Sequence, residues 1–509
     1  MSSSLRFWLL ILAVSAIGLA LRLHFLAEPL WLDELHTAWS VDVPFSQIAD
    51  RAGQGNQTPL FFWLTKCLTS IIGLTPLSLR LVSMICSCLA IPAAAFFVFH
   101  MTRNTMAAVV TGALVAVDHW GLFYATEARP YAMLELLALL QFWSFLWLLD
   151  SAKGSSRFCV TLILLTFALL ATHLTGMLLL ATEVILATCI RRNRMKILTS
   201  LLIGCLAAIP ILVFGFSIFE NRNQWNSDSG IVPMLQQWQN NLLFQLVPAA
   251  CIFLVGGYKV SKTFDRGTIL YLMSWAVVPL LLAALLHSFD IPLASYRYTT
   301  VAAIAFPVCV GIAMPLIGTK WLAIVISILV VGLNCAMNPV LQSTLHHRSI
   351  PSFRSEDWES AIHFVKNEFQ EDSSKLLFLM PNLYEDSRAL DADSATFNEY
   401  LKFPVSGIYV LPESIEVVPL PTRIANVWQG KPIEKLIRHG GALLICRTDG
   451  KRFAQIENEI RNAAIKSGHK IELKSFEQPG NVLKIAKIHV LINGLNDEPS
   501  SSDAIRDHE

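Results

Sequence analysis

The sequence predicts a polytopic α-helical membrane protein that ends in a C-terminal extracytoplasmic α/β domain. Of its 509 residues, 54% are hydrophobic and only 15% are charged, whereas about a quarter of the residues of a soluble domain are charged. Apolar runs of transmembrane length alternate with short basic loops as far as residue 340, after which the sequence becomes polar. The mean hydropathy of +0.52 agrees with this class.

The first apolar run, residues 5–26, predicts an uncleaved transmembrane helix. It is longer than the apolar core of a signal peptide. Arg6 marks its inner end, and Arg22 near its outer end is expected to extend its side chain to the interface.

Basic residues orient the spans, because lysine and arginine collect in cytoplasmic loops. The run Pro59–Leu74 is short and could either cross the membrane or lie in the interface. If it lies in the interface, every later basic cluster falls on the side of Arg6. We therefore expect a cytoplasmic N-terminus and eleven spans, at about residues 5–26, 79–99, 106–124, 131–149, 158–172, 175–190, 197–217, 242–257, 268–287, 299–317 and 321–339.

The polar remainder of the chain predicts a small α/β domain outside the membrane. Ser355, Glu356 and Asp357 are typical of a helix start, and an apolar stripe follows them at helical spacing. The expected strands are residues 376–380, 407–411, 442–446 and 482–490, with a polar helix at 451–466. The predicted division is a transmembrane domain at 1–340, an α/β domain at 341–492 and a disordered tail at 493–509.

Charge and cysteine content exclude several classes of function. The formal net charge is +1, which does not favour binding to nucleic acid. Most of the ten cysteines lie inside apolar runs, so the sequence predicts neither a disulfide framework nor a zinc site.

The stretch Trp31–Ser40, WLDELHTAWS, is the first candidate for chemistry. Asp33 and Glu34 directly follow the first span, and carboxylates at the mouth of a transmembrane helix are costly to retain without a function. His36 and two tryptophans accompany them, and such amphipathic side chains are typical of a membrane interface. The alternative interpretation is an exposed acidic loop.

The predicted topology brings further charged groups to the outer face. Glu127 and Arg129 occupy the turn between the third and fourth spans, Arg80 opens the second span and Arg297 opens the tenth. Arginine suits a phosphate because its planar guanidinium can donate two parallel hydrogen bonds. For each arginine taken alone, snorkelling or pairing with a carboxylate is an equally good explanation.

These groups together indicate group transfer from a lipid phosphate. Arginines would stabilise the negative charge that develops on the departing phosphate. A carboxylate would accept the proton of the acceptor hydroxyl. Because a phosphodiester leaves readily, one base and one or two arginines suffice.

Four motifs follow the first apolar helix in a fixed order: Trp31-Leu32-Asp33-Glu34, Thr58-Pro59-Leu60-Phe61-Phe62, Leu79-Arg80-Leu81 and Glu127-Ala128-Arg129-Pro130-Tyr131. This order resembles the integral-membrane GT-C glycosyltransferases. It is most similar to bacterial relatives of dolichyl-phosphate-mannose protein mannosyltransferase (family 39) and of the aminoarabinose transferase acting on lipid A. The resemblance covers residues 1–340 and, weakly, Glu356-Asp357-Trp358. Relatives commonly carry His-Pro-Pro where this chain has Gln57-Thr58-Pro59.

The resemblance implies a GT-C-like fold, a polyprenyl-phosphate sugar donor and inversion at the anomeric carbon. It implies no cofactor and no obligatory metal, and residues 1–340, which carry the resemblance, lack the D-x-D pattern of the metal-dependent members. On this analogy Asp33 activates the acceptor, with Glu34 as the competing candidate. The resemblance also implies Glu127 as a second acid, with Arg129 and Arg297 at the donor phosphate. We further expect Arg80 at the donor phosphate, and His36, Tyr131 and Tyr296 as substrate contacts.

The expected partners are the polyprenyl-phosphate sugar, membrane lipids and an acceptor, which is a glycolipid, a protein or a polysaccharide. The protein is expected in the inner (plasma) membrane. A transporter or flippase of lipid-linked sugars is the alternative, although it would show matched broken helices with ionisable groups near mid-membrane. A structural or assembly protein would leave Asp33 and Glu127 unexplained.

Overall fold

In a computed structural model of the chain, the protein divides into two units. Unit 1 comprises Met1–Glu28 and His36–Pro351, and unit 2 comprises Pro29–Leu35 and Ser352–Glu509. The predicted tail, residues 493–509, lies outside the described residues. The structure describes residues 3–491 except 25, 27, 56, 151–155, 190–192, 212, 214–229, 257–265, 343–355, 372–374, 384–394, 423–425 and 477–481.

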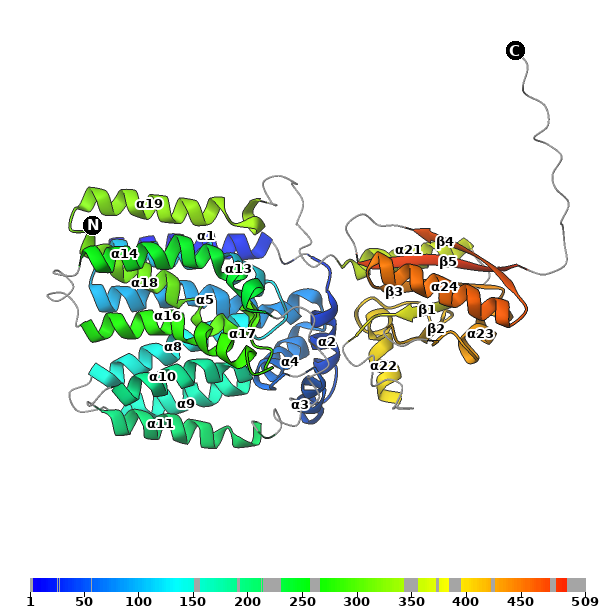
Figure 1. Ribbon diagram of the computed structural model, residues 1–509, viewed down its shortest axis with the longest axis horizontal. Helices are drawn as coiled ribbons and strands as arrows, with labels where there is room; N and C mark the ends of the chain where they lie inside the picture. Colours follow the sequence, from blue (N-terminus) through cyan, green and yellow to red (C-terminus); the bar gives the residue numbers. More distant parts are fainter. Residues whose placement is uncertain are drawn as a thin grey trace, which may run out of the picture. The chain divides into compact units, whose positions relative to one another are not determined.

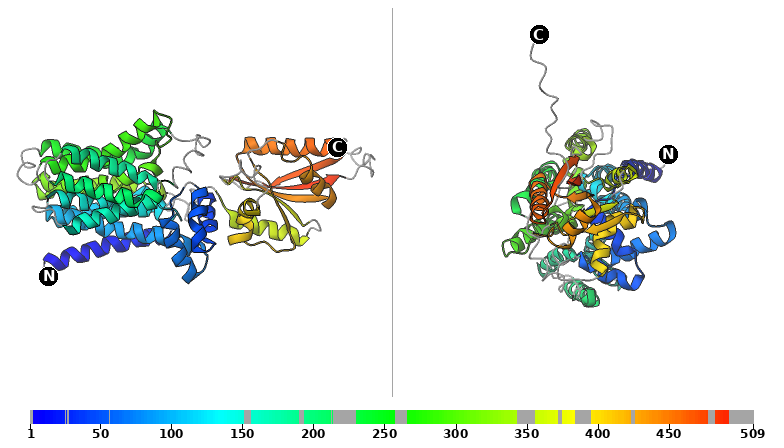
Figure 2. Two further views of the ribbon diagram at one scale, coloured as in Figure 1. Left: turned by 90° about the horizontal axis from the view of Figure 1, so that it is seen from below. Right: turned by 90° about the vertical axis from the view of Figure 1, so that its right-hand side faces the viewer.

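Unit 1 is a bundle of helices that lie side by side, with α2, α3 and α4 running across one end (Figure 1, Figure 2). A transverse arrangement suits these three helices because each is too short to cross a bilayer. The helices are α1 (Ser3–His24), α2 (Leu32–Val41), α3 (Phe45–Gln54), α4 (Leu60–Ile72), α5 (Pro76–Thr102), α6 (Thr105–Ala116), α7 (His119–Ala125), α8 (Tyr131–Asp150), α9 (Ser156–Thr172), η1 (Leu174–Gly176), α10 (Met177–Cys189), α11 (Arg194–Ala207), α13 (Ile231–Asn241), η3 (Leu242–Leu246), α14 (Val247–Val255), α16 (Arg266–His287), α17 (Tyr296–Thr299), η4 (Thr300–Ala302), α18 (Ala305–Ala313), η5 (Met314–Ile317) and α19 (Lys320–Ala336).

The helices identify a multi-pass membrane protein. Among the described residues, six helices are long and apolar enough to cross a membrane. A seventh span results if α6 and α7, which meet at 57°, form one broken span. The run expected to lie in the interface forms α4, one of four apolar helices of only 10–17 residues. The total of eleven spans stays a prediction.

Small residues allow the central helices of unit 1 to approach closely, as is common where helices pack in membranes. A Cβ atom placed on Gly311 of α18 would lie 1.9 Å from the Thr111 hydroxyl oxygen of α6. The same hydroxyl donates a hydrogen bond of 3.4 Å to the Pro307 carbonyl. A glycine is therefore required at this crossing of α6 and α18.

Arg22 does not reach the interface as the sequence suggested. Its side chain is fully buried, and it donates hydrogen bonds to Ser87 Oγ at 2.9 Å and to the Ala116 carbonyl at 3.0 Å. Ala116 is the last residue of α6, so the guanidinium meets the negative end of that helix. The bend between α6 and α7 exposes carbonyls that a straight helix would bond internally, and Arg22 satisfies them.

Unit 2 contains a five-stranded mixed sheet with the strand order β2-β1-β3-β5-β4. Strands β2, β1 and β3 are parallel, and β5 pairs antiparallel with both β3 and β4. The elements are α21 (Trp358–Glu371), β1 (Leu376–Met380), α22 (Ala395–Phe403), η6 (Pro404–Ile408), β2 (Glu416–Pro419), α23 (Lys431–His439), β3 (Gly441–Arg447), α24 (Gly450–Lys466), β4 (Lys470–Phe476) and β5 (Leu483–Leu491).

The two edge strands are the ones that the sequence did not reveal. Three of the four expected strands correspond to β1, β3 and β5, whereas the expected strand at 407–411 overlaps the π-helical segment η6. Strand β4 was missed because it contains three lysine or glutamate residues in seven and only one buried side chain. Charged side chains are typical of edge strands, which must not pair with other chains.

Helices cover both faces of this sheet. Phe378 of β1 and Leu444 of β3 belong to a core that also contains residues of α23 and α24. Because side chains alternate along a strand, Lys487 of β5 points to the opposite face, where it forms an ion pair of 3.3 Å with Glu368 of α21. The apolar stripe of α21 is buried as predicted, from Trp358 to Phe369.

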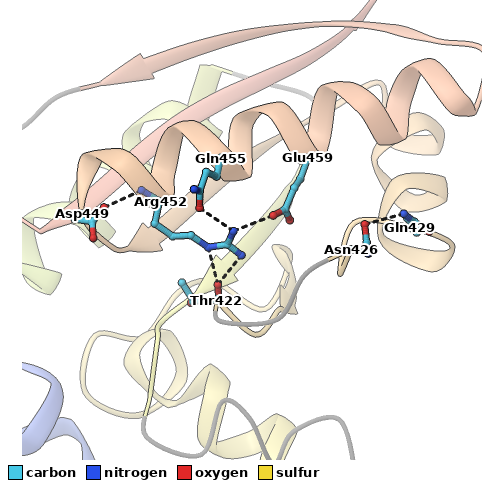
Figure 3. Close-up of polar contacts among 7 residues, drawn as sticks. All are labelled: Thr422, Asn426, Gln429, Asp449, Arg452, Gln455 and Glu459. Carbon is cyan, nitrogen blue, oxygen red and sulfur yellow. Dashed lines mark hydrogen bonds and ion pairs between the residues drawn. The ribbon is translucent and has the colours of Figure 1, made fainter. Parts of the chain in front are cut away.

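A polar network ties α24 to the chain that follows β2 (Figure 3). Arg452 donates to the Thr422 carbonyl from Nε at 3.3 Å and from Nη2 at 3.1 Å. Its Nη1 atom donates to Glu459 at 2.9 Å, and its backbone N–H donates to the capping carboxylate of Asp449 at 2.7 Å. These contacts make Arg452 a structural residue of the α/β unit.

Candidate active site

The acidic pair lies in the first turn of α2, and both carboxyl side chains are buried. Acidic residues are favoured there by the helix dipole. The two residues differ in their local contacts, because the Trp31 N–H donates a long hydrogen bond of 3.4 Å to Glu34 Oε2. This is the glutamate half of a capping box, which assigns Glu34 a part in starting the helix. Asp33 lies one position earlier on α2.

Helix α2 belongs to both units, since residues 32–35 group with unit 2 and the remainder with unit 1. Within unit 1, the Thr37 hydroxyl donates a hydrogen bond of 2.8 Å to the Ala128 carbonyl. Thr37 lies four residues after Asp33, and residues at this spacing share one face of a helix. Asp33 and Thr37 are therefore on the same face of α2.

His36 is packed within the transverse helices. It is fully buried, its ring is 6.4 Å from the ring of Phe62, and its Nε2 atom lies 3.3 Å from Ser40 Oγ. A Cβ atom on Gly55 would lie only 2.1 Å from the same Nε2 atom. These contacts describe a residue that joins α2 to the end of α3 and to α4.

Arg51 fixes the orientation of α2 from the other side. Its Nη1 atom donates a hydrogen bond of 2.9 Å to the Trp39 carbonyl, and its guanidinium carbon lies 4.3 Å from the centroid of the Trp39 ring. A cation over an indole face adds a favourable electrostatic contact. The second half of α2 is thus held by neighbours from three directions.

The turn Glu127-Ala128-Arg129 lies between α7 and α8, with the side chains of Glu127 and Arg129 each only 2% exposed. The Arg129 N–H donates to the Glu127 carbonyl at 2.7 Å, and the Ser83 hydroxyl of α5 donates to the Arg129 carbonyl at 2.8 Å. Pro130 disfavours a helical backbone at Arg129, so α8 cannot begin earlier. A buried acid and a buried arginine are therefore presented together on a turn whose backbone is fixed by two helices.

Arg80 binds backbone carbonyls of unit 1. It is fully buried, and its Nη1 atom donates hydrogen bonds to the Leu26 carbonyl at 2.7 Å and to the Glu28 carbonyl at 2.6 Å. These carbonyls belong to the chain that leads from α1 towards α2. Arg80 thereby anchors that connection from the first turns of α5.

Tyr296 and Arg297, two of the expected site residues, are the first two residues of α17. The side chain of Tyr296 is 1% exposed, and its ring stacks on Trp238 at 4.2 Å and on Trp120 at 4.6 Å between centroids. The Tyr296 N–H donates to Gln237 Oε1 at 2.8 Å. Arg297 follows directly and is half-buried.

Tyr124 of α7 lies between an aromatic residue of α8 and one of α17. Its ring lies 4.7 Å from the ring of Tyr131 and 6.1 Å from that of Tyr296. The structure therefore brings two of the expected residues, Tyr131 and Tyr296, beside one tyrosine.

The buried polar atoms of this unit that have no hydrogen-bond partner among the described residues include Gln57 Oε1, Thr58 Oγ1 and the Tyr296 hydroxyl. Buried polar groups are normally satisfied, so each of them needs an explanation. A polar substrate would satisfy such groups.

Sequence reasoning missed the residues that hold the site together. Thr37 and Ser83 fix the 127–129 turn, whereas Tyr124 and Trp238 contribute aromatic surface. A single threonine or serine in an apolar helix gives no signal in one sequence. An aromatic residue inside a predicted span, such as Tyr124, or just before one, such as Trp238, is equally typical of ordinary packing.

Comparison with known proteins shows which proteins this chain resembles. Residues 56–214 match the family model of dolichyl-phosphate-mannose-protein mannosyltransferase. The crystal structure of ArnT from Cupriavidus metallidurans in the apo state is similar, with a TM-score of 0.54 at 13% identity over 96% of this chain and 98% of that one. The same protein bound to undecaprenyl phosphate gives a TM-score of 0.53 with the same identity and coverage.

The apo oligosaccharyltransferase of Archaeoglobus fulgidus gives a TM-score of 0.54 at 9% identity, over 87% of this chain and 69% of that chain. A search of curated proteins finds no significant match. The chain thus has the GT-C glycosyltransferase fold, and the comparisons relate it to the mannosyltransferases and to the aminoarabinose transferase, as the motifs predicted.

Proposed function

We propose that this protein transfers a sugar from a polyprenyl-phosphate donor to an acceptor hydroxyl on the extracytoplasmic face of the inner membrane, with inversion. The observation that carries the proposal is the buried turn 127–129, where Glu127 and Arg129 are held together by Thr37 of α2 and Ser83 of α5. Buried ionisable groups at the end of a membrane span are functional by default. The acceptor is a glycolipid, a protein or a polysaccharide.

The proposed step is a displacement at the anomeric carbon. The acceptor oxygen attacks this carbon from the face opposite the phosphate, the bond between the carbon and the phosphate oxygen breaks, and polyprenyl phosphate leaves. Asp33 takes the proton of the acceptor hydroxyl as general base. Arg129 and Arg297 stabilise the charge that develops on the phosphate. Glu34 acts through the start of α2, and Glu127 is the second acid of the site.

The aromatic cluster and the buried polar atoms suit the sugar. An amphipathic ring such as that of Tyr296 can pack against a pyranose while its hydroxyl bonds a substrate oxygen. That hydroxyl is one of the buried groups without a partner among the described residues. ArnT, which shares the fold, has been crystallised with undecaprenyl phosphate, a lipid of the proposed donor class.

The direct test is incubation of the purified protein with a polyprenyl-phosphate sugar labelled in the sugar. We expect release of polyprenyl phosphate and, with acceptor present, transfer of the label, at a rate that depends on Asp33. Donor that stays intact in detergent but changes leaflet in proteoliposomes would support a flippase and contradict the proposal. Comparison of surface glycolipids and glycoproteins by mass, with and without the protein, identifies the acceptor.

The proposed topology has its own test. A reporter fused after Gln342 is expected to be extracytoplasmic, and one fused after Arg194 cytoplasmic, because the basic clusters all lie on the side of Arg6. Alkaline phosphatase and green fluorescent protein fusions report the two sides oppositely. If both fusions report the same side, the eleven-span topology and the placement of the site outside the cytoplasm are wrong.

A further inference from the structure

Helix α2 begins at a residue that cannot cap it. The first N–H groups of a helix need acceptors, which a local serine, threonine, aspartate or asparagine usually supplies. The residue before α2 is Trp31, whose indole is only a donor. The Glu34 carboxylate serves the Trp31 N–H and leaves the Leu32 N–H, the first of the helix proper, to another acceptor.

That acceptor comes from a distant part of the chain within unit 2. Glu356 Oε2 accepts a hydrogen bond of 3.0 Å from the Leu32 N–H, across 324 positions of sequence. A second contact of the same kind lies two residues earlier, where the Leu30 N–H donates to the Tyr409 hydroxyl at 2.9 Å. The N–H groups of Leu30 and Leu32, two residues apart in the segment 29–35, therefore both donate hydrogen bonds to side chains of the α/β fold.

Glu356 is itself held rigidly. Its side chain is 2% exposed, and its Oε1 atom accepts from Nε and Nη2 of Arg447, each at 2.6 Å. The Trp358 indole donates to Oε2 at 3.2 Å. Burial raises the pKa of the Glu356 carboxyl, while Arg447 and the two N–H donors oppose that effect. A charge-assisted pair of this geometry keeps the capping carboxylate in one orientation.

The position of Arg447 shows which end of the sheet contacts the segment 29–35 through Glu356. It is the last residue of β3, a strand parallel to β1 and β2. Ligands of α/β domains bind outside the carboxyl ends of parallel strands. Here, that end of β3 holds, through Glu356, the protein's own segment 29–35.

We propose that Glu356, oriented by Arg447, is a positioning residue that sets Asp33 for catalysis by capping α2. Asp33 directly follows Leu32, so loss of the bond to the Leu32 N–H would free the turn that carries the carboxylate. This inference rests on the proposed role of Asp33 as general base. It gives the α/β unit a defined part in the reaction.

The first test measures the cap without measuring activity. Amide hydrogen exchange of the full-length protein in nanodiscs is followed by mass spectrometry for a peptide spanning residues 29–41. In Glu356→Ala we expect this peptide to exchange about tenfold faster, because a hydrogen bond to a charged acceptor is lost. In Glu356→Gln, which retains an acceptor oxygen, we expect a smaller increase. Unchanged exchange in Glu356→Ala would overturn the proposal.

The matched control is Glu368→Ala, which removes an acid of α21 whose partner is Lys487 of β5. It is expected to leave exchange of the peptide and sugar transfer unchanged. If Glu356→Ala does not fold, Arg447→Gln removes the guanidinium that orients the capping carboxylate and is expected to speed exchange of the same peptide. Unchanged exchange in that variant would also overturn the proposal.

The second test measures coupling to Asp33. Glu356→Gln is expected to lower kcat about tenfold with KM for the donor within about twofold, and to have no further effect in an Asp33→Asn background. A purely structural role would lower transfer by the same factor in both backgrounds, which would overturn the proposal. Faster exchange in a protein that transfers no sugar at all would support the cap and contradict the proposed function.

Discussion

Asp33→Asn is expected to lower sugar transfer by about a hundredfold or more while donor binding stays largely intact. Asparagine is nearly the same shape but cannot accept the proton of the acceptor hydroxyl. Asp33 lies in the first turn of α2, one turn before the threonine that bonds the 127–129 turn. The measurement is single-turnover transfer from a labelled polyprenyl-phosphate sugar, with donor binding determined separately.

Two comparisons make this prediction specific. Asp42→Asn, just beyond the other end of α2, changes an exposed acid of the same type and is expected to transfer at the normal rate. Glu34→Gln retains an oxygen that can accept from the Trp31 N–H, so we expect a smaller loss. A normal rate in Asp33→Asn with a large loss in Glu34→Gln would move the base by one residue.

The second large effect is expected for Arg129→Lys. Lysine keeps the charge but lacks the planar fork that donates two parallel hydrogen bonds to a phosphate. We expect kcat/KM for the donor to fall by more than about tenfold, that is, by more than about 1.4 kcal/mol of transition-state stabilisation. Because Arg129 is only 2% exposed, water cannot replace the hydrogen bonds that the lysine would fail to donate to the phosphate.

Arg194→Lys is the control for this exchange, because Arg194 is exposed at the start of α11. It is expected to have no effect on transfer. The binding constant for free polyprenyl phosphate should weaken in Arg129→Lys in parallel with the loss of rate. Unchanged kinetics together with unchanged binding would return Arg129 to a role in packing alone.

The helical body of unit 1 could be predicted because it depends on properties that each segment carries alone. A run of apolar residues such as 131–149 is a helix in a membrane whatever surrounds it, since its backbone groups must be satisfied internally. Strand β4 could not be predicted in this way. Its mixture of lysine, glutamate and leucine becomes a strand only because β5 offers an edge to pair with.

The charged residues also could be predicted only in part. The sequence showed that arginines and acids lie near the ends of the predicted helices. It did not show which of these residues only support the fold. Arg22 and Arg80 both occupy helix ends in the sequence, and both bond backbone carbonyls in the structure. Their partners are up to 94 positions away, so only the packing of helices could distinguish them from Arg129.

By itself, the sequence determined that the body of the protein lies in a membrane, because hydropathy defines it, and the order of short motifs showed a resemblance to the GT-C glycosyltransferases. These features are local, so one chain displays them in full. Only the tertiary structure decided how the site is held, with Thr37 and Ser83 fixing the 127–129 turn and Glu356 capping α2. A hydrogen bond between residues hundreds of positions apart leaves no trace in either residue's neighbourhood, because it depends on where the whole chain has brought them.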